Sequence, residues 1–140
     1  MKKVITIAAA LMLAPGFATA ESFQDAFEMN RAMYGKNHTF KWNGKQYSTN
    51  HEEEVEAAVA ATKENALDLI AKAKAKNKEV AELGFEWRLT GGILTDAEKA
   101  VEAGDFRKAL DLAAQAKYHA RMGIQQHADA QKSWHLSVPQ

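Results

Sequence analysis

Methionine and histidine are the residues of this sequence best suited to binding a metal ion or a haem. Met29 and Met33 stand one helical turn apart and His38 follows them, and thioethers with imidazoles are typical copper ligands. A methionine from this segment and His127 also have the chemistry of axial ligands for a non-covalently bound haem. Methionines at helical spacing more often fill a core. A copper- or haem-binding carrier is therefore an alternative function.

The histidines do not have the spacing of a zinc site. No two of the five are three or four residues apart, the spacing that places two imidazoles on one side of a helix. His119, His127 and His135 are eight apart, so each is turned by about 80° from the previous one. They cannot converge from one straight helix. His127 alone projects onto the apolar side of its predicted helix.

The composition excludes several classes of function. The chain has no cysteine, which removes disulfides, thiolate metal sites, Fe–S clusters, covalently attached haem and cysteine nucleophiles. It contains no G-x-S-x-G, no H-E-x-x-H and no glycine-rich phosphate loop, and its carboxylates fall mainly in predicted helix caps and solvated faces. Its 18 basic residues balance 18 acidic ones, so no net field attracts nucleic acid. We expect neither an enzyme nor a nucleic-acid-binding protein.

The first twenty residues have the pattern of a secretory signal peptide. Lys2 and Lys3 precede an apolar run over 4–14, and Ala18-Thr19-Ala20 has the small residues of a cleavage site. The run is shorter than the roughly 20 residues that a membrane-spanning helix needs. We predict cleavage after Ala20, export to the periplasm, and no membrane association after cleavage.

Residues 21–50 are predicted to form a short helix and a β-hairpin. Ser22 is a suitable N-cap for a helix over 23–34, which Gly35 ends. Asn43-Gly44 favours a type I′ turn, which would place Phe40, Trp42 and Tyr47 on one face of the hairpin. Because a two-stranded hairpin is marginally stable alone, this aromatic face should pack on a helix or on a partner.

Residues 51–128 are predicted to form a helical domain. Asn50, with Glu53 as its capping-box partner, should open a long helix. The lysines at 72, 74, 76 and 78 lie off its apolar side and indicate a solvated face. The residues predicted to share the apolar side are Val55, Val59, Thr62, Ala66, Leu69, Ile70, Ala73 and Val80.

Glycines mark the expected boundaries between helices in the rest of this domain. The apolar pattern changes phase at Gly84, so we expect a bend or short break near Gly84 or Gly91-Gly92, with a second helical segment over 85–103. Gly104-Asp105 has the residues of a helix C-terminus followed by an N-cap. A last helix should run from Phe106 to about His127, and 129–140 should be a frayed tail. The predicted fold is mostly α, an antiparallel helical hairpin or three-helix bundle with a small N-terminal β-hairpin.

The segment Phe85-Glu86-Trp87-Arg88 has two interpretations. Trp87 can pack in the helical core, with Glu86 and Arg88 solvated. Alternatively, Trp87 and Arg88 form an exposed anchor for a protein partner, since both residue types are enriched at interface hot spots. The pattern alone leaves both open.

A set of motif residues lies in the region from Ala57 to Gln126. They are Gly84-Phe85-Glu86-Trp87-Arg88-Leu89-Thr90, Ile93, Ala97, Ala100, Ala103-Gly104-Asp105-Phe106, Ala109, Leu112-Ala113, Ala116-Lys117 and Gly123. With these residues the region resembles the family of small periplasmic SoxXA-binding proteins, which has Asp at the position of Leu89. The resemblance implies an accessory protein that carries no haem or other cofactor and binds the SoxXA c-type cytochrome of thiosulfate oxidation.

The leading hypothesis is therefore a periplasmic, non-catalytic accessory protein of sulfur oxidation. If the resemblance holds, Trp87, Arg88 and Phe106 are candidate partner contacts, although Trp87 and Phe106 are equally suited to holding a helix pair together. The sequence does not fix the partner or the oligomeric state.

Overall fold

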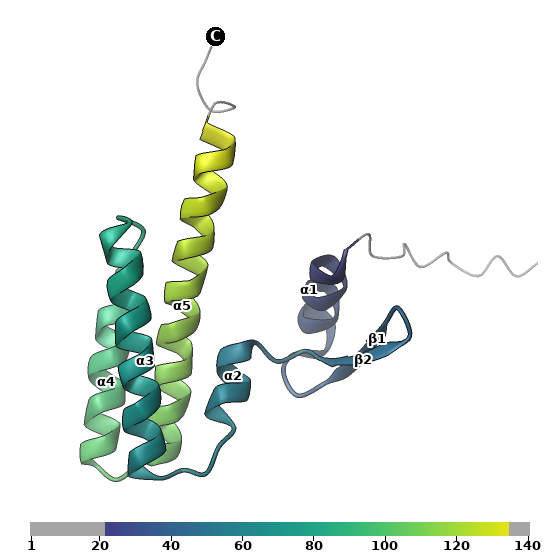
Figure 1. Cartoon of the computed structure of the whole chain (residues 1–140). Helices are drawn as coiled ribbons and strands as arrows, with labels where there is room; N and C mark the ends of the chain where they lie inside the picture. Colours follow the sequence, from purple (N-terminus) through teal and green to yellow (C-terminus); the bar gives the residue numbers. More distant parts are fainter. Residues whose placement is uncertain (1–21, 135–140) are drawn as a thin grey trace, which may run out of the picture. The chain divides into compact units, whose positions relative to one another are not determined.

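The computed structural model describes residues 22–134 and confirms a mostly helical chain with a small β-hairpin (Figure 1). The predicted signal peptide, residues 1–20, and positions 135–140 of the predicted tail lie outside the described residues. The chain divides into two compact units between Thr49 and Asn50. No helix within 22–134 combines the length and apolar character needed to cross a bilayer.

The N-terminal unit contains α1 (Phe23–Tyr34), β1 (Thr39–Trp42) and β2 (Lys45–Ser48). The Ser22 hydroxyl accepts a hydrogen bond from the backbone N–H of Asp25 at 3.2 Å, which confirms the predicted N-cap. Asn43 and Gly44 have φ values of 47° and 78°, as a type I′ turn requires, and Phe40 pairs with Tyr47.

An aromatic cluster joins α1 to the hairpin. The Phe23 ring lies 6.1 Å from Phe40, 5.4 Å from Trp42 and 4.7 Å from Tyr47, between ring centroids. The predicted aromatic face of the hairpin therefore packs on a helix of its own unit. Aromatic pairs in this geometry contribute beyond their buried area, which matters in so small a unit.

The second unit is a three-helix bundle with a short additional helix. Its long helices are α3 (Lys63–Glu82), α4 (Thr90–Glu102) and α5 (Phe106–Ser133), and α2 (Glu52–Ala57) packs against α5. Gly84 and Gly104, with φ of 75° and 78°, reverse the chain after α3 and α4. In both turns the backbone N–H of the residue after the glycine donates a hydrogen bond to the carbonyl five residues earlier. These bonds join Phe85 to Val80 at 3.2 Å and Asp105 to Ala100 at 2.8 Å.

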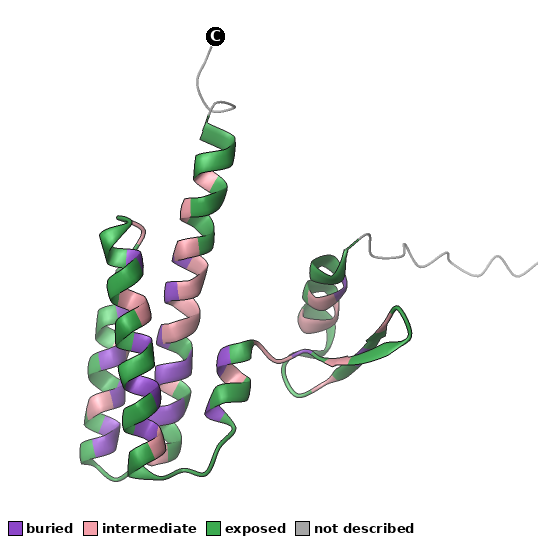
Figure 2. Ribbon diagram, in the orientation of Figure 1, coloured by how far each residue is buried: buried purple, intermediate pink, exposed green. Residues whose placement is uncertain are grey.

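Small residues form most of the core between these helices. Figure 2 shows the buried positions along the facing sides of α3, α4 and α5. Leu110 is fully buried among alanines, so the helices can approach closely. The main cluster lies toward the turn between α4 and α5, and a smaller one surrounds Ala73, Leu94 and Ala116.

The single long helix predicted from Asn50 is wrong. His51, not Asn50, is the N-cap of α2, and the Glu54 carboxylate, not that of Glu53, accepts a hydrogen bond from the N-cap N–H, at 2.9 Å. Helix α2 ends at Ala57. The Thr62 hydroxyl caps α3 by accepting from the Asn65 N–H at 3.2 Å, a local bond that competes with helix continuation.

Three of the residues predicted on the apolar side are consequently exposed, and one of them is Thr62, the N-cap of α3. Val55 and Val59 face solvent because the helix breaks after Ala57, so these two residues no longer continue the apolar side of α3. The positions from Ala66 to Val80 on the same predicted side are buried.

The chain reverses over 83–89 instead of forming a helix from 85. The expected break near Gly84 is present, Thr90 begins α4, and Gly91-Gly92 lie inside that helix. Helix α5 continues to Ser133, five residues past the predicted end of the helical domain at 128, because Ala128 and Ala130 are strong helix formers. The tail predicted from 129 is helical as far as Ser133.

The lysines at 72, 74, 76 and 78 lie on a solvated face, as predicted, and each of these four pairs with a carboxylate. Their partners are Asp68 for Lys72, Glu98 for Lys74, Glu79 for Lys76 and Glu82 for Lys78. Exposed pairs of this kind contribute little to stability, so this face serves mainly solubility.

Candidate partner-binding turn

Residues 83–89, here called the 83–89 turn, connect α3 to α4 and fold onto α5. The indole Nε1–H of half-buried Trp87 donates to Oε1 of Gln126 at 2.9 Å, and its ring lies 4.9 Å from the His119 ring. The Phe85 ring meets His127 edge-on at 5.0 Å. Trp87 is thus a packing residue that fixes the turn.

Gly123 lets the 83–89 turn approach α5 this closely. A Cβ at this position would lie 2.6 Å from the Phe85 carbonyl oxygen and 2.6 Å from Cγ2 of Val80, closer than heavy atoms can pack. On the side of α3, the Asn77 amide donates to the Glu86 carboxylate at 2.6 Å. The turn is therefore attached to both neighbouring helices.

Arg88 and Leu89 are exposed at the end of the 83–89 turn, as Leu83 and Glu86 are nearer its start. Leu89 is 71% exposed, more than any other large apolar residue within 22–134. Arg88 is exposed and makes no hydrogen bond or ion pair with the described part of the chain. Leu89 precedes α4 without a capping side-chain bond, and the first turn of α4 has no acidic residue.

The structure does not bring the three predicted contact residues together. Phe106 begins α5, is half-buried, and packs against the main core cluster. Helix α4 separates it from the 83–89 turn, and thirteen helical residues span about 20 Å. Trp87 and Arg88 thus lie at one end of the bundle and Phe106 at the other.

The His119 imidazole, which contacts the Trp87 ring, is partly buried. Its Nδ1 is buried and has no hydrogen-bond partner within the described residues, and the same holds for Nδ1 of His127. Burial lowers the pKa of His119 below the usual 6.5, because desolvation penalises the charged imidazolium. The packing of the 83–89 turn on α5 therefore favours the neutral form of His119.

An ionic contact between α2 and α5 was missed in the sequence. Glu53 is 1% exposed, and its carboxylate accepts from Nε of Arg121 at 2.6 Å and from Nη2 at 3.1 Å. This bond raises the pKa of Arg121. Glu56 accepts from Lys117 at 2.5 and 2.6 Å. The sequence does contain a signal for this contact. Glu53 and Glu56 are three residues apart and Lys117 and Arg121 are four apart, so each pair has the spacing that places two side chains on one face of a helix.

The residues of the metal-carrier alternative belong to both units, and each is described within its own unit. Met29 is exposed, and Met33 is 65% exposed on α1. The His38 ring stacks on Tyr34 at 4.2 Å, and His127 packs against Phe85. Within 22–134 no three histidine, aspartate or glutamate side chains gather in a metal-binding arrangement.

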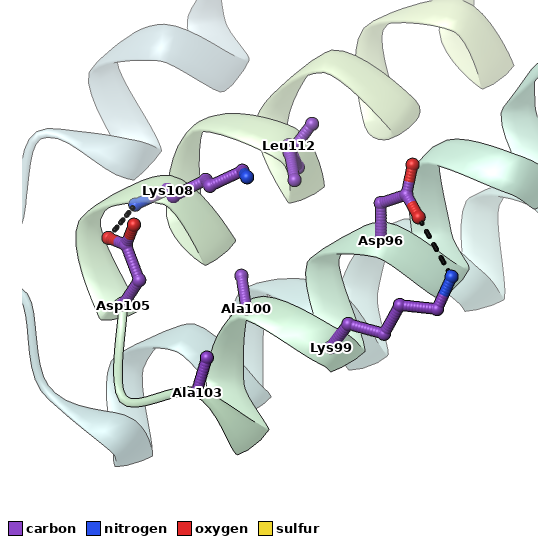
Figure 3. A pocket seen from close by; sticks show the side chains of 7 residues that line it. All are labelled: Asp96, Lys99, Ala100, Ala103, Asp105, Lys108 and Leu112. Atoms are coloured by element: carbon purple, nitrogen blue, oxygen red, sulfur yellow. Dashed lines mark hydrogen bonds and ion pairs between the residues drawn. The ribbon is translucent and has the colours of Figure 1, made fainter.

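A shallow hollow of about 440 Å³ lies between α4 and α5, near the turn that joins them (Figure 3). Two acidic and two basic residues surround a floor of small and apolar side chains. Asp96 pairs with Lys99 at 3.2 Å, and the Asp105 carboxylate caps α5 by accepting the Lys108 N–H at 3.1 Å. These carboxylates are already engaged, and the charge around the hollow is balanced.

Comparisons with protein-family models, with curated proteins and with solved structures found no match to this chain.

Proposed function

We propose that this chain is an exported, non-catalytic accessory protein that binds a protein partner through Arg88 and Leu89 of the 83–89 turn. The observation that carries the proposal is the contrast within this turn. Phe85, Glu86 and Trp87 are tied to α3 and α5, while the next two residues expose a free guanidinium and the most exposed large apolar side chain of the described chain.

This arrangement has two properties of an effective binding surface. Arginine is enriched among the residues that dominate interface energies, and an apolar neighbour supplies area that a partner can bury. The fixed backbone reduces the ordering cost that a flexible loop would incur on binding. In this proposal Trp87 is a positioning residue, and Phe106 supports the core at the far end of the bundle.

The partner we propose is a SoxXA-type c-type cytochrome in the periplasm. This choice rests on the sequence resemblance from Gly84 to Thr90 and from Ala103 to Phe106, and the compartment rests on the leader ending at Ala20. The described structure adds that the first of these blocks contains the proposed contact residues.

Calorimetric titration of the mature chain with a purified SoxXA-type cytochrome tests this proposal. We expect Arg88→Ala and Leu89→Ala each to weaken binding by about tenfold, equivalent to roughly 1.4 kcal/mol. Lys78→Ala and Leu67→Ala remove an exposed cation and an exposed leucine from α3 and serve as matched controls with unchanged affinity. Absence of binding by the wild-type chain, or equal affinity of all four variants, would overturn the proposal.

A further inference from the structure

The packing of the 83–89 turn on His119 has a consequence for how this turn responds to acid. We propose that the turn is a pH-controlled latch, closed on α5 while the His119 imidazole is neutral and released when that imidazole takes up a second proton. The latch is a property of the isolated chain. Only its effect on partner binding, through Arg88 and Leu89, rests on the proposed function.

The buried Nδ1 of His119 is the first basis of this proposal. A neutral imidazole can carry its proton on Nε2 and leave only a lone pair at Nδ1, which costs little when buried. The imidazolium carries protons on both nitrogens, so an N–H would then lie at a buried position with no acceptor. Burying an unpaired donor together with a positive charge is costly. Protonation therefore favours any rearrangement that brings His119 into water.

Opening of the turn is the rearrangement that we propose for this step. The main core cluster lies toward the other end of the bundle, around Leu110. The turn itself is held by the Trp87–Gln126 and Asn77–Glu86 hydrogen bonds, by the backbone hydrogen bond from Phe85 to Val80 and by two ring contacts. Segments with few buried apolar contacts open locally at a lower free energy than the whole domain.

Attraction between an imidazolium and the Trp87 indole would act in the opposite direction. Cation–π contacts are strongest when the cation lies over the ring face. Here the two rings are tilted by 42° at 4.9 Å, and desolvation is the cause that sets the direction of the shift in the pKa of His119. In the proposed latch, we expect burial of the charge to outweigh this attraction.

Most of the other charged groups around this part of α5 have partners of their own. No carboxylate is positioned to accept a proton from His119 Nδ1, because Nδ1 has no partner within the described residues. Tyr118 and His127 flank His119 along α5, and Arg88 of the turn is exposed. The paired groups facing α5 or next to the turn are Glu53 with Arg121, Glu56 with Lys117, Lys76 with Glu79, Glu86 with Asn77, and Asp96 with Lys99.

Nuclear magnetic resonance of the isolated chain tests the latch directly. The three indole N–H signals are assigned with single Trp→Phe variants, and His119 is assigned with His119→Gln. On titration from pH 7.5 to 4.5, we expect the Trp87 indole signal to move toward that of an exposed indole, with the same midpoint as the His119 ring and below pH 6.5. The Trp42 signal, from the other unit, should not follow this midpoint.

The glutamine of His119→Gln cannot titrate, so this variant should lack the response of the Trp87 signal. A response caused by protonation of carboxylates near pH 4 would persist in the variant, so the two causes can be told apart. His38→Gln removes a histidine from the N-terminal unit and should leave the response intact. The latch is overturned if the Trp87 signal stays constant while His119 titrates in the wild-type chain, a result that needs no variant to fold. It is also overturned if His119→Gln responds like wild type.

The same titrations distinguish this inference from the proposed function. A chain that opens with acid but binds no cytochrome at pH 7.5 overturns only the proposed function. A chain that binds the cytochrome while its Trp87 signal ignores pH overturns only the latch. If both proposals hold, cytochrome affinity falls with acid at the midpoint of His119, and His119→Gln removes that dependence.

Discussion

Glu53 of α2 and Arg121 of α5 form a two-point ion pair, with nitrogen–oxygen distances of 2.6 and 3.1 Å, in which the carboxylate is almost completely buried. Arg121 also lies 3.1 Å from Glu52 and 5.3 Å from the centre of the Tyr118 ring. Ala57 is the only apolar residue that α2 buries. The ionic contact therefore attaches α2 to the bundle alongside the buried Ala57.

Glu53→Gln should lower the free energy of unfolding by about 1–3 kcal/mol, because it leaves a partly buried guanidinium without its main counter-charge. Urea denaturation at neutral pH measures the loss. Glu56→Gln removes one charge of the more exposed pair with Lys117 and should cost under about 1 kcal/mol. Equal losses in the two variants would contradict the importance of burial at Glu53.

Gly123→Ala should destabilise the chain by about 1–3 kcal/mol, since the added methyl group meets the Phe85 carbonyl and Val80 and must displace the 83–89 turn. Thermal unfolding followed by circular dichroism gives the change. Gly92→Ala is the matched control within a helix, because a Cβ there meets open space and alanine is the better helix former. It should stabilise the chain, so the two variants should differ in sign.

Leu89→Asp should stabilise the chain by roughly 0.3–1 kcal/mol. A negative charge at the N-terminal end of α4 interacts favourably with the helix dipole, and the first turn now has no acidic residue. Leu89→Lys also removes the apolar side chain but introduces a positive charge, and it should not stabilise the chain. Chemical denaturation at low and high salt compares them, and the difference should shrink as salt screens the dipole.

Stability should fall as the pH decreases from about 6.5. The pKa of His119 is lowered in the folded chain, so below its usual value the unfolded chain binds more protons than the folded one. The stability is complete above the unfolded pKa and is lost progressively as the pH falls toward the folded pKa. Urea midpoints at a series of pH values should therefore depend less on pH in His119→Gln. An identical pH profile in both chains would contradict the assignment.

Phe23→Ala should disrupt the N-terminal unit, with a loss of about 2 kcal/mol, because this ring contacts both strands of the hairpin. Near-ultraviolet circular dichroism and Trp42 fluorescence report on the cluster. Met33→Ala, on the same helix but 65% exposed, should leave both signals unchanged. A cluster signal retained in Phe23→Ala would show that the strands hold together without α1.

Features set by local backbone geometry were predictable from sequence. Ser22 accepts from an N–H three residues away, and Asn43-Gly44 and Gly104 adopt the positive φ values that their residue types favour. Each of these signals lies within a few residues of the structure it produces. The helix boundaries around 50–62 were not predictable in this way, because Glu53 is engaged by Arg121, 68 residues later.

The candidate site was predictable only in part, for a similar reason. Residue type singled out Trp87 and Arg88, but their different roles depend on Gln126 and His119, which lie far along the chain on α5. Phe106 was grouped with them by motif. Its separation follows from the reversals at Gly84 and Gly104, which place the two turns at opposite ends of α4.

The position of α5 in the chain constrains when folding can finish. Helices α2, α3 and α4 all pack on α5, and α3 and α4 contact each other much less than either contacts it. Helix α5 is also the last of these elements to leave the ribosome. The earlier helices therefore lack their main packing surface during most of synthesis. The bundle can assemble only after the ribosome has synthesised α5, which begins at Phe106.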